Sequence, residues 1–174
     1  MITDLVEIRR LGEKKRGENE KLRQHMKRHE FVERRLRRIA EDIEDEIDCT
    51  VCANCCRHAT VKLQERDVDP LARHLRLSRS KFLAQYAEQS EEEGLILKRT
   101  PEHGCVFLDG NLCSVYEARP ATCVGFPHLV RGAGSLQSRM WQMVDRACYC
   151  PIVYNALEAF KVEVRFFEKS GAKR

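Results

Sequence analysis

Residues 49–56 read CTVCANCC and place four cysteines within one short stretch. The nine cysteines of the chain are Cys49, Cys52, Cys55, Cys56, Cys105, Cys113, Cys123, Cys148 and Cys150. A two-residue gap between cysteines lets one turn direct both sulfur atoms at a single ion, so C-x2-C spacing recurs in zinc and iron–sulfur sites. We therefore predict that the nine thiols are metal ligands and that the metal organises the middle of the chain.

The absence of visible targeting signals makes a reducing cytosol the default compartment, in which disulfides are rare and thiols stay available to metals. No stretch of about 18 apolar residues occurs, so no membrane span is predicted. The N-terminal sequence MITDLVEIRRLGEKK also lacks an apolar run of signal-peptide length. We therefore expect a cytoplasmic protein. The odd number of cysteines fits poorly with complete disulfide pairing, and a net charge of +4 does not by itself identify an anionic partner.

Two kinds of metal site compete for the cysteines. Cys49, Cys52 and Cys55 follow one another at gaps of two, as in the loop that holds a 4Fe–4S cluster, and the Cys-Pro pair at residues 150–151 is typical of such motifs. Structural zinc more often takes two separated C-x2-C pairs. An iron–sulfur cluster, with 4Fe–4S favoured, is therefore the first expectation, and zinc is the alternative. Cys55 and Cys56 are expected to serve different centres, or one of them is free, because neighbouring residues of an extended chain point in opposite directions.

The segment of residues 100–130 is rich in turn-forming residues and has little apolar periodicity. A structural zinc ion contributes roughly 10–16 kcal/mol of apparent binding free energy, whereas the net stability of a whole domain is about 5–15 kcal/mol. We therefore expect this segment to need the ion in order to fold.

The first 48 residues contain no cysteine and predict one long helix from about residue 19 to about residue 47. Its apolar residues recur at helical spacing, apart from one step of six between residues 26 and 32. They are Leu22, Met26, Val32, Leu36, Ile39, Ile43 and Ile47. Residues 7–38 carry 13 Lys/Arg against 6 Asp/Glu. This basic stretch is expected to be a solvated helix face, and the alternatives are a docking arm for nucleic acid or an acidic protein and a dimerising coiled coil.

Short elements are expected after the first cysteine group. The apolar spacing predicts a helix after Asp67 with Pro70 near its first turn, and Ser78 is a good N-cap for a second helix. Residues 95–97 and 106–108 are strand candidates, and the second is followed by Asp-Gly-Asn, which favours a tight turn.

The C-terminal sequence predicts an amphipathic helix, because apolar residues from Val153 to Phe167 step by four and three, with Pro151 suited to the first turn. The predicted fold class is mainly α with a small β-hairpin. The predicted organisation is a charged N-terminal helical arm, residues 1–48, and a compact, metal-centred helical domain with turn-rich cysteine loops, residues 49–174.

Other side chains near the cysteines are possible participants. His58, His103 and His128 are candidate ligands, although a lone histidine more often lies beside a metal site than in it. Arg119-Pro120 precedes Cys123, where the guanidinium could offset thiolate charge or bind a carboxylate.

The combined motif resembles the CxxCxxCC family of bacterial cysteine-cluster proteins. The likeness rests on C-x2-C-x2-C-C at residues 49–56, G-C-x-F-L at 104–108, C-S-V-Y-E-A-R-P-A-T-C at 113–123 and G-F-P at 125–127. The resemblance implies a zinc- or iron-chelating domain built from the seven cysteines between residues 49 and 123. A larger relative with the same motif, flagellin lysine methylase, carries an iron–sulfur cluster, so an enzyme is one implied possibility.

Three functions follow from these observations. The first is a small cytoplasmic protein that holds an iron–sulfur cluster, with room for two metal centres, in which Cys148 and Cys150 complete the ligand set. The second is a metal-dependent enzyme for redox or methyl-transfer chemistry. The third is an interaction module, in which a zinc site holds the fold and the basic helix of residues 7–38 binds a protein or nucleic acid.

Overall fold

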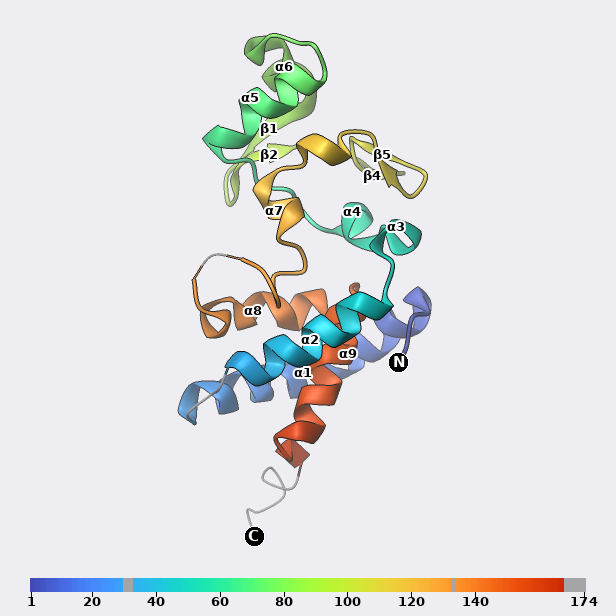
Figure 1. The fold of residues 1–174 in the computed structure, drawn as a ribbon, viewed down its shortest axis with the longest axis vertical. Helices are drawn as coiled ribbons and strands as arrows, with labels where there is room; N and C mark the ends of the chain where they lie inside the picture. The colour runs from blue at the N-terminus through green and yellow to red at the C-terminus, as the bar shows by residue number, and fades with distance from the viewer. Residues whose placement is uncertain (30–32, 133, 168–174) are drawn as a thin grey trace. The chain divides into compact units, whose positions relative to one another are not determined.

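The chain is mainly α with small antiparallel hairpins, as predicted. The computed structural model describes residues 1–29, 33–132 and 134–167. Contacts between residues divide the chain into two compact units, which can be followed in Figure 1. The unit that we call the helical unit contains residues 1–48 and the chain from residue 127 onward. The second unit, which we call the cysteine unit, contains residues 49–126.

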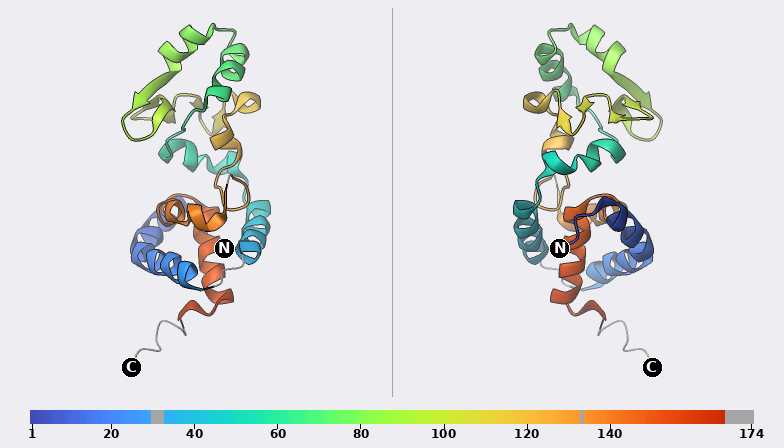
Figure 2. Two further views of the ribbon diagram at one scale, coloured as in Figure 1. Left: turned by 90° about the vertical axis from the view of Figure 1, so that its left-hand side faces the viewer. Right: turned by 90° about the vertical axis from the view of Figure 1, so that its right-hand side faces the viewer.

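The helical unit is organised around its C-terminal helix. Its helices are α1 (Leu5–Arg28), α2 (Glu33–Glu46), α8 (Leu136–Arg146) and α9 (Pro151–Glu163). Helix α9 contacts the other three and lies between α1 and α2 (Figure 2). The predicted apolar steps are confirmed at Val153, Leu157 and Phe160, which are buried. The prediction is wrong at Phe167, which is exposed, because α9 ends at Glu163. Pro151 occupies the first turn of α9, where its missing N–H leaves no hydrogen bond unmade.

The prediction of one helix from residue 19 to residue 47 is wrong. Helix α1 ends at Arg28, because His29 has extended backbone angles (φ −119°, ψ 149°), and α2 begins at Glu33. Residues 30–32 lie outside the described residues. The break coincides with the step of six in the apolar pattern. In a continuous helix, six residues rotate a side chain by about 240° around the axis, which would move the next apolar residue off the buried face. Separate helices let α1 and α2 pack on different sides of α9.

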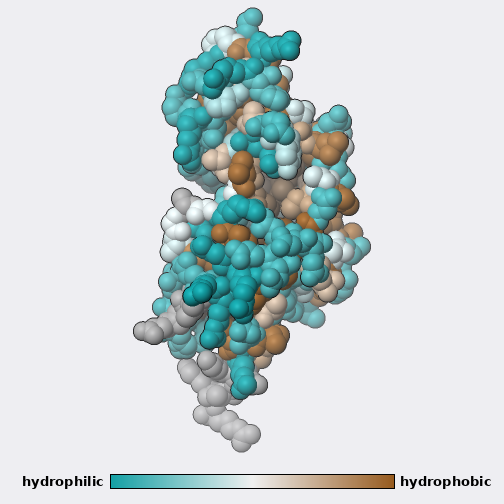
Figure 3. All heavy atoms as spheres, viewed as in Figure 1, coloured by the Kyte–Doolittle hydropathy of each residue, from teal (hydrophilic) through white to brown (hydrophobic). Residues whose placement is uncertain are grey.

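Both N-terminal helices pack into the helical unit through apolar faces. Ile8, Leu22 and Met26 of α1 are buried, and so are Leu36 and Ala40 of α2. Hydrophilic residues cover the opposite face along α2 (Figure 3). The described part of the basic stretch therefore lies on helices that pack through their apolar faces, which agrees with the expectation of a solvated helix face.

The cysteine unit consists of short elements. Its helices are α3 (Cys49–Cys52), α4 (Asn54–His58), α5 (Glu65–His74), α6 (Arg79–Tyr86), the single 3₁₀ turn η1 (Tyr116–Ala118) and α7 (Ala121–Val124). Its hairpins pair β1 (Ala87–Ser90) with β2 (Gly94–Leu97), β3 (Arg99–Thr100) with β4 (Gly104–Cys105), and β5 (Leu108–Asp109) with β6 (Leu112–Cys113).

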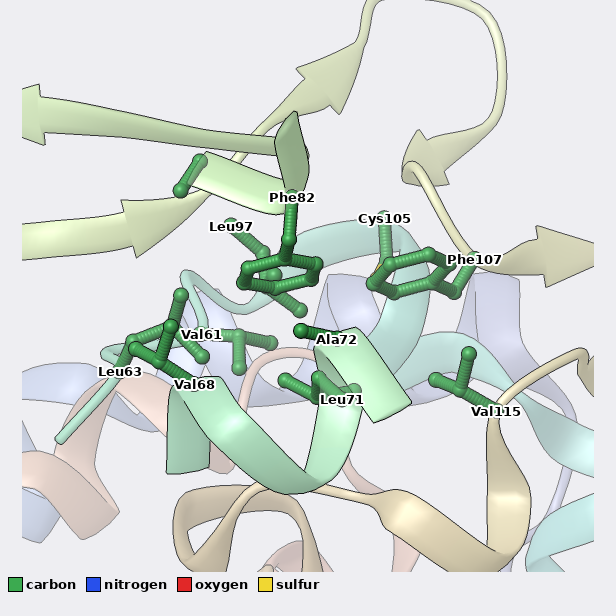
Figure 4. Close-up of a cluster of buried hydrophobic side chains, with 11 residues drawn as sticks. Val61, Leu63, Val68, Leu71, Ala72, Phe82, Leu97, Cys105, Phe107 and Val115 are labelled. Carbon is green, nitrogen blue, oxygen red and sulfur yellow. The ribbon is translucent and has the colours of Figure 1, made fainter. Parts of the chain in front are cut away.

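A small apolar core holds these elements together. Phe82 of α6 packs over Leu71 of α5, and Leu97 of β2 lies beside them (Figure 4). Tyr86 stacks between Phe82 and Phe107, with ring centroids 5.9 and 5.0 Å away. Cys105 lies beside Phe107 at the edge of this core, so apolar packing reaches the cysteines directly.

The local predictions in this unit are mostly confirmed. Ser78 caps α6 by accepting the N–H of Lys81 at 3.3 Å, and residues 95–97 lie in β2. The predicted tight turn joins β5 to β6, and its Gly110 has a φ of 57°. The strand predicted at residues 106–108 is wrong except at Leu108, because the chain turns at residues 106 and 107. Pro70 lies inside α5, which begins at Glu65, before the predicted start.

The two compact units differ from the predicted division after residue 126. Both divisions separate the chain after residue 48, but residues from 127 onward group with the N-terminal helices. The reason is that α8 packs on α1, and α9 packs on both α1 and α2. Among the described residues, no helix is long and apolar enough to cross a membrane.

Candidate metal centre

The first cysteine group is carried by two short helical turns. A left-handed residue, Ala53 (φ 45°), separates α3 from α4, and its N–H donates to the carbonyl of Cys49 at 2.8 Å. Cys49 is exposed, whereas Cys52, Cys55 and Cys56 are half-buried. Cys49 and Cys52 are three residues apart in a helical turn, so their side chains leave the same side of it.

Cys55 and Cys56 do not point in opposite directions as expected for an extended chain, because both belong to α4. Consecutive helical residues are about 100° apart around the helix axis, which leaves their side chains within reach of each other. The two side chains form a hydrogen bond with each other. The two neighbouring thiols are therefore linked rather than divided between opposite faces.

A glycine brings the second cysteine segment against α4. Gly104 (φ 82°) lies so close to α4 that an added Cβ would be 2.6 Å from both the Cα atom of Arg57 and the carbonyl oxygen of Cys56. Both neighbours are main-chain atoms, so only a residue without a Cβ fits. Cys105, the next residue in β4, is thereby held next to the part of α4 that carries Cys56.

Arg57 fixes the third segment, which carries Cys113. Its guanidinium donates to the carbonyl of Cys52 at 3.2 Å and to the carbonyl of Gly110 at 2.8 Å. Asn111 adds a further link, because its side-chain amide donates to the carbonyl of Val51 at 2.8 Å. The β5–β6 turn is thus tied to both α3 and α4, and Cys113 is the last residue of β6 in the same hairpin.

A buried carboxylate anchors the fourth segment, which carries Cys123. One oxygen of Asp67 accepts the N–H of Gln64 at 2.8 Å, and the other accepts the N–H of Ala121 at 3.1 Å. Ala121 is the first residue of α7, and Pro120 before it is extended (φ −54°, ψ 152°). This bond ties the short helix with Cys123 to α5.

Four thiols from these four segments interact electrostatically: those of Cys56, Cys105, Cys113 and Cys123. We call them the coupled thiols. Burial is the largest cause that raises the pKa of Cys123 from its ordinary value of 9.0 to about 12, and the charges of the other three coupled thiols act in the same direction. Burial likewise raises the pKa of Cys105 and of Cys113, and the charge of Cys56 adds to both.

Cys56 behaves differently from its three neighbours. The hydrogen bond from Cys55 lowers the pKa of Cys56 from 9.0 to about 7, and the charges of Arg57, Arg119 and Arg99 act in the same direction against burial. The centre therefore contains one thiol that ionises near neutral pH and three that hold their protons. A bound soft cation would displace those protons, because thiolates are the ligands that such cations take.

Three arginines, Arg57, Arg99 and Arg119, act electrostatically on the coupled thiols, and only Arg119 was singled out from the sequence. Its charge lowers the pKa of Cys56, Cys113 and Cys123. This agrees with the expectation that its guanidinium offsets thiolate charge. The roles of Arg57 and Arg99, like that of Gly104, depend on contacts between distant segments. Only the exposed carbonyls at the end of α4 could have suggested a cationic partner.

Cys148 and Cys150 belong to the helical unit and are buried there. Arg16 donates to the sulfur of Cys148 at 3.3 Å, and burial raises the pKa of this thiol to about 11. Cys150 is the N-cap of α9 and is followed by Pro151 at the first helical position. The Cys-Pro pair thus has a local structural role, and the prediction that both cysteines complete the ligand set stays a prediction.

The candidate histidines divide in the same way. His58 ends α4 in the cysteine unit, and His103 lies in the β3–β4 turn, where its N–H donates to the hydroxyl of Thr100 at 3.1 Å. His128 belongs to the helical unit, and its carbonyl accepts a hydrogen bond from Arg139 at 3.2 Å.

The donor set fits a soft metal in its chemistry. All four coupled thiols are sulfur donors, and the charged groups that act on them are one another and arginines. In the part of the chain that the structure describes, no three Cys, His, Asp or Glu side chains are grouped closely enough to hold an ion. Coordination would therefore need the thiols to draw closer together, around a backbone arrangement that already brings their segments together.

Comparisons with known proteins agree with this reading. A family model described as CxxCxxCC, a putative zinc- or iron-chelating domain, matches residues 48–151. No curated protein and no solved structure matches the chain. The family match spans more than half of the 174 residues and includes all nine cysteines. The chain therefore belongs to the CxxCxxCC family of zinc- or iron-chelating domains.

Proposed function

We propose that this protein holds an iron–sulfur cluster through cysteine thiolates in the reducing cytoplasm, with 4Fe–4S as the first choice of cluster. The observation that carries the proposal is that contacts at Gly104, Arg57 and Asp67 bring together four separate segments. These segments carry Cys56, Cys105, Cys113 and Cys123. Four cysteines are the number that a 4Fe–4S cluster or a structural zinc ion takes.

Burial of unpaired thiols explains why the site should bind a cation. Deprotonating Cys123 is costly in the metal-free protein, because its pKa is about 12. A metal ion or cluster supplies the positive charge that compensates the buried thiolate. Binding would therefore stabilise the cysteine unit as well as neutralise it, and bound metal and folding would be coupled.

The choice of iron over zinc rests on the first cysteine group. Cys49, Cys52 and Cys55 add three thiols to the coupled four, and a single zinc ion has no use for seven. The C-x2-C-x2-C run is typical of cluster-binding loops, which favours a cluster that draws ligands from this run. An additional ion at Cys49, Cys52 and Cys55 would give the second centre that the sequence suggested.

Metal analysis of protein purified without oxygen tests this proposal. We expect a brown protein with visible charge-transfer absorption and about four iron and four sulfide per chain. A colourless protein with stoichiometric zinc would overturn the cluster and retain thiolate coordination. A protein without bound metal that also fails to take up iron or zinc would overturn the proposal as a whole.

Variants of single cysteines show which thiols hold the metal. Cys123→Ser is expected to lower the metal content, because it removes one of the coupled thiols. Cys148→Ser is the matched comparison, since it replaces a buried thiol of the helical unit. Loss of metal in the Cys148 variant alone would mean that the coupled thiols are not the ligands.

A second candidate function, binding of an anionic partner, is favoured by one row of side chains on α1. Arg10, Lys14, Lys21 and Arg28 are all exposed and lie within about 40° of one another around the helix. Deleting residues 1–40 would not test this, because both N-terminal helices pack on α9. The better test is Lys14→Glu with Lys21→Glu. Salt-dependent binding of a labelled nucleic acid should be lost in this variant, and unchanged binding would rule out the surface.

A further inference from the structure

Three arginines of the cysteine unit lie in or beside cysteine segments and have no carboxylate partner among the described residues. Within the described ranges, Arg57, Arg99 and Arg119 form no ion pair with a carboxylate. Arg66, Arg73 and Arg76 of the same unit form no ion pair with a described residue either, whereas Arg79 pairs with both Glu65 and Asp69. What sets Arg57, Arg99 and Arg119 apart is their place beside the cysteine segments. The charges of the three arginines are therefore not balanced by nearby acids.

Each of the three is positioned beside a cysteine segment. Arg57 directly follows Cys56 and donates to carbonyls of α3 and of the β5–β6 turn. Arg99 is the cross-strand partner of Cys105, and it donates to the carbonyl of Arg57 at 2.5 Å and to that of Ala59. Their planar, multi-donor guanidinium groups can hold the end of α4 and still present positive charge to the thiols.

Arg119 is held mainly by a ring. Its guanidinium lies 3.5 Å from the ring centroid of Tyr116, and its Nε donates to the carbonyl of the same residue at 2.9 Å. These contacts lie within its own turn of chain, so the side chain is oriented locally and links no distant segments. Replacing Arg119 therefore changes the charge of the site with little change in the fold.

The charges of thiols and arginines match a metal-bound state. In the metal-free protein only Cys56 of the coupled thiols ionises near neutral pH, so at most one negative charge from these thiols faces the three arginines. Four thiolates around a divalent ion, or around a 4Fe–4S core with charge +2, leave a net charge of −2. Three guanidinium groups with a total charge of +3 are suited to that anionic centre, because interactions of this kind are strong where water is partly excluded.

We propose that Arg57, Arg99 and Arg119 are positioning residues that form a positive frame around the coupled thiols and favour an anionic tetrathiolate metal centre. The proposal rests on the proposed function, because it needs the four thiols to be ligands. It adds a selection by charge: the site prefers an ion or cluster whose complex with four thiolates is negative. The frame raises metal affinity through the attraction between its positive charges and the anionic complex.

The test uses Cd²⁺, a soft divalent ion, in competition with a chelator on the full-length reduced protein. Arg119→Gln should lower the affinity for Cd²⁺ by at least about tenfold, and should shift the pH at which binding is half complete to a higher value. Arg119→Lys should recover most of the affinity because it restores the charge. Arg79→Gln, which removes an exposed arginine of the same unit, is the matched control and should bind like the unchanged protein.

The outcomes separate the frame from the proposed function. If the unchanged protein binds no Cd²⁺, the proposed function fails. If it binds and Arg119→Gln binds equally well at every pH, the frame fails alone. The urea midpoint of the metal-free Arg119→Gln variant should be close to that of the unchanged protein. A loss of metal-free stability that accounts for the weaker binding, or an equal defect in Arg119→Lys, would show that Arg119 acts through packing and would overturn the proposal.

Discussion

Gly104 provides the sharpest test of how the cysteine segments are brought together. Gly104→Ala adds a Cβ that would be 2.6 Å from two main-chain atoms of α4, at a residue with a φ of 82°. Gly94→Ala is a closely matched control, because Gly94 has a φ of 77° and open space where the Cβ would lie. The two variants share the backbone strain and differ only in the contact with α4.

The expected magnitudes follow from these two contributions. A left-handed backbone costs an alanine about 1–2 kcal/mol, so Gly94→Ala should lower the free energy of unfolding by about that amount. The clash at residue 104 cannot be relieved by rotating a side chain, and overpacking of this kind costs about 1–3 kcal/mol more. Gly104→Ala should therefore lose roughly 2–5 kcal/mol in total.

Urea unfolding of the reduced, metal-free protein, followed by far-ultraviolet circular dichroism, gives the stability difference. The same two variants are then titrated with Cd²⁺. Gly104→Ala should bind more weakly than Gly94→Ala, because moving β4 away from α4 separates Cys105 from Cys56. Equal stability and equal affinity in the two variants would refute the argument that close approach at Gly104 assembles the site.

Three further predictions concern other parts of the molecule. Asp67→Ala leaves the N–H groups of Gln64 and Ala121 without their buried acceptor and should lower the free energy of unfolding by roughly 2–4 kcal/mol. Asp69→Ala, at an exposed carboxylate, should lower it by less than about 1 kcal/mol, and urea unfolding measures both. In α1, Gly17→Ala should raise the urea midpoint, because alanine favours a helix more than glycine does and the added Cβ meets no atom within 4 Å. Gly12→Ala should lower the midpoint, because its Cβ would be 2.5 Å from the carbonyl oxygen of Ala147; Trp141 fluorescence reports both, and equal midpoints would contradict the close packing. In the metal-free protein, Cys123 has a pKa of about 12 when folded and 9.0 when unfolded, so its contribution to the free energy of unfolding is complete below pH 9 and is lost as the pH rises toward 12. This part of the alkaline destabilisation should be absent in Cys123→Ala. An identical dependence of stability on pH in the two proteins would count against the burial of the thiol.

Features encoded over short distances could be predicted from the sequence. Ser78 caps a helix through an atom three residues from the bond that it satisfies, and the turn at Gly110 needs only its own backbone freedom. The C-terminal helix is equally local, because a regular apolar stripe identifies its buried face. The cysteine spacing also indicated a metal-binding domain correctly, because thiols two residues apart can bind one ion from a single turn, whatever the rest of the fold.

Features that depend on meetings between distant segments could not be predicted. Nothing in the neighbourhood of Gly104 in the sequence indicates that it must approach Arg57, which lies 47 positions earlier. The same holds for Asp67, whose oxygen accepts the N–H of Ala121. The break between α1 and α2 was visible as an irregular step in the apolar pattern, but without glycine or proline the pattern alone did not show that the helix ends.

The core also changes the expected balance between metal binding and apolar packing in the cysteine loops. Residues 100–130 were expected to depend on the ion, yet Phe107 and Val115 from this segment are buried in the core with Phe82 and Leu71. Burying a large apolar side chain contributes about 1.5–3 kcal/mol, so these two offset part of the entropy of ordering the loops. With Gly104, Arg57 and Asp67 fixing the main chain, the ion has to order chiefly the thiol side chains, and each of these loses far less conformational freedom than a backbone residue does. Metal affinity in this protein should therefore respond as strongly to substitutions in the apolar core, such as Phe107→Ala, as to substitutions beside the thiols.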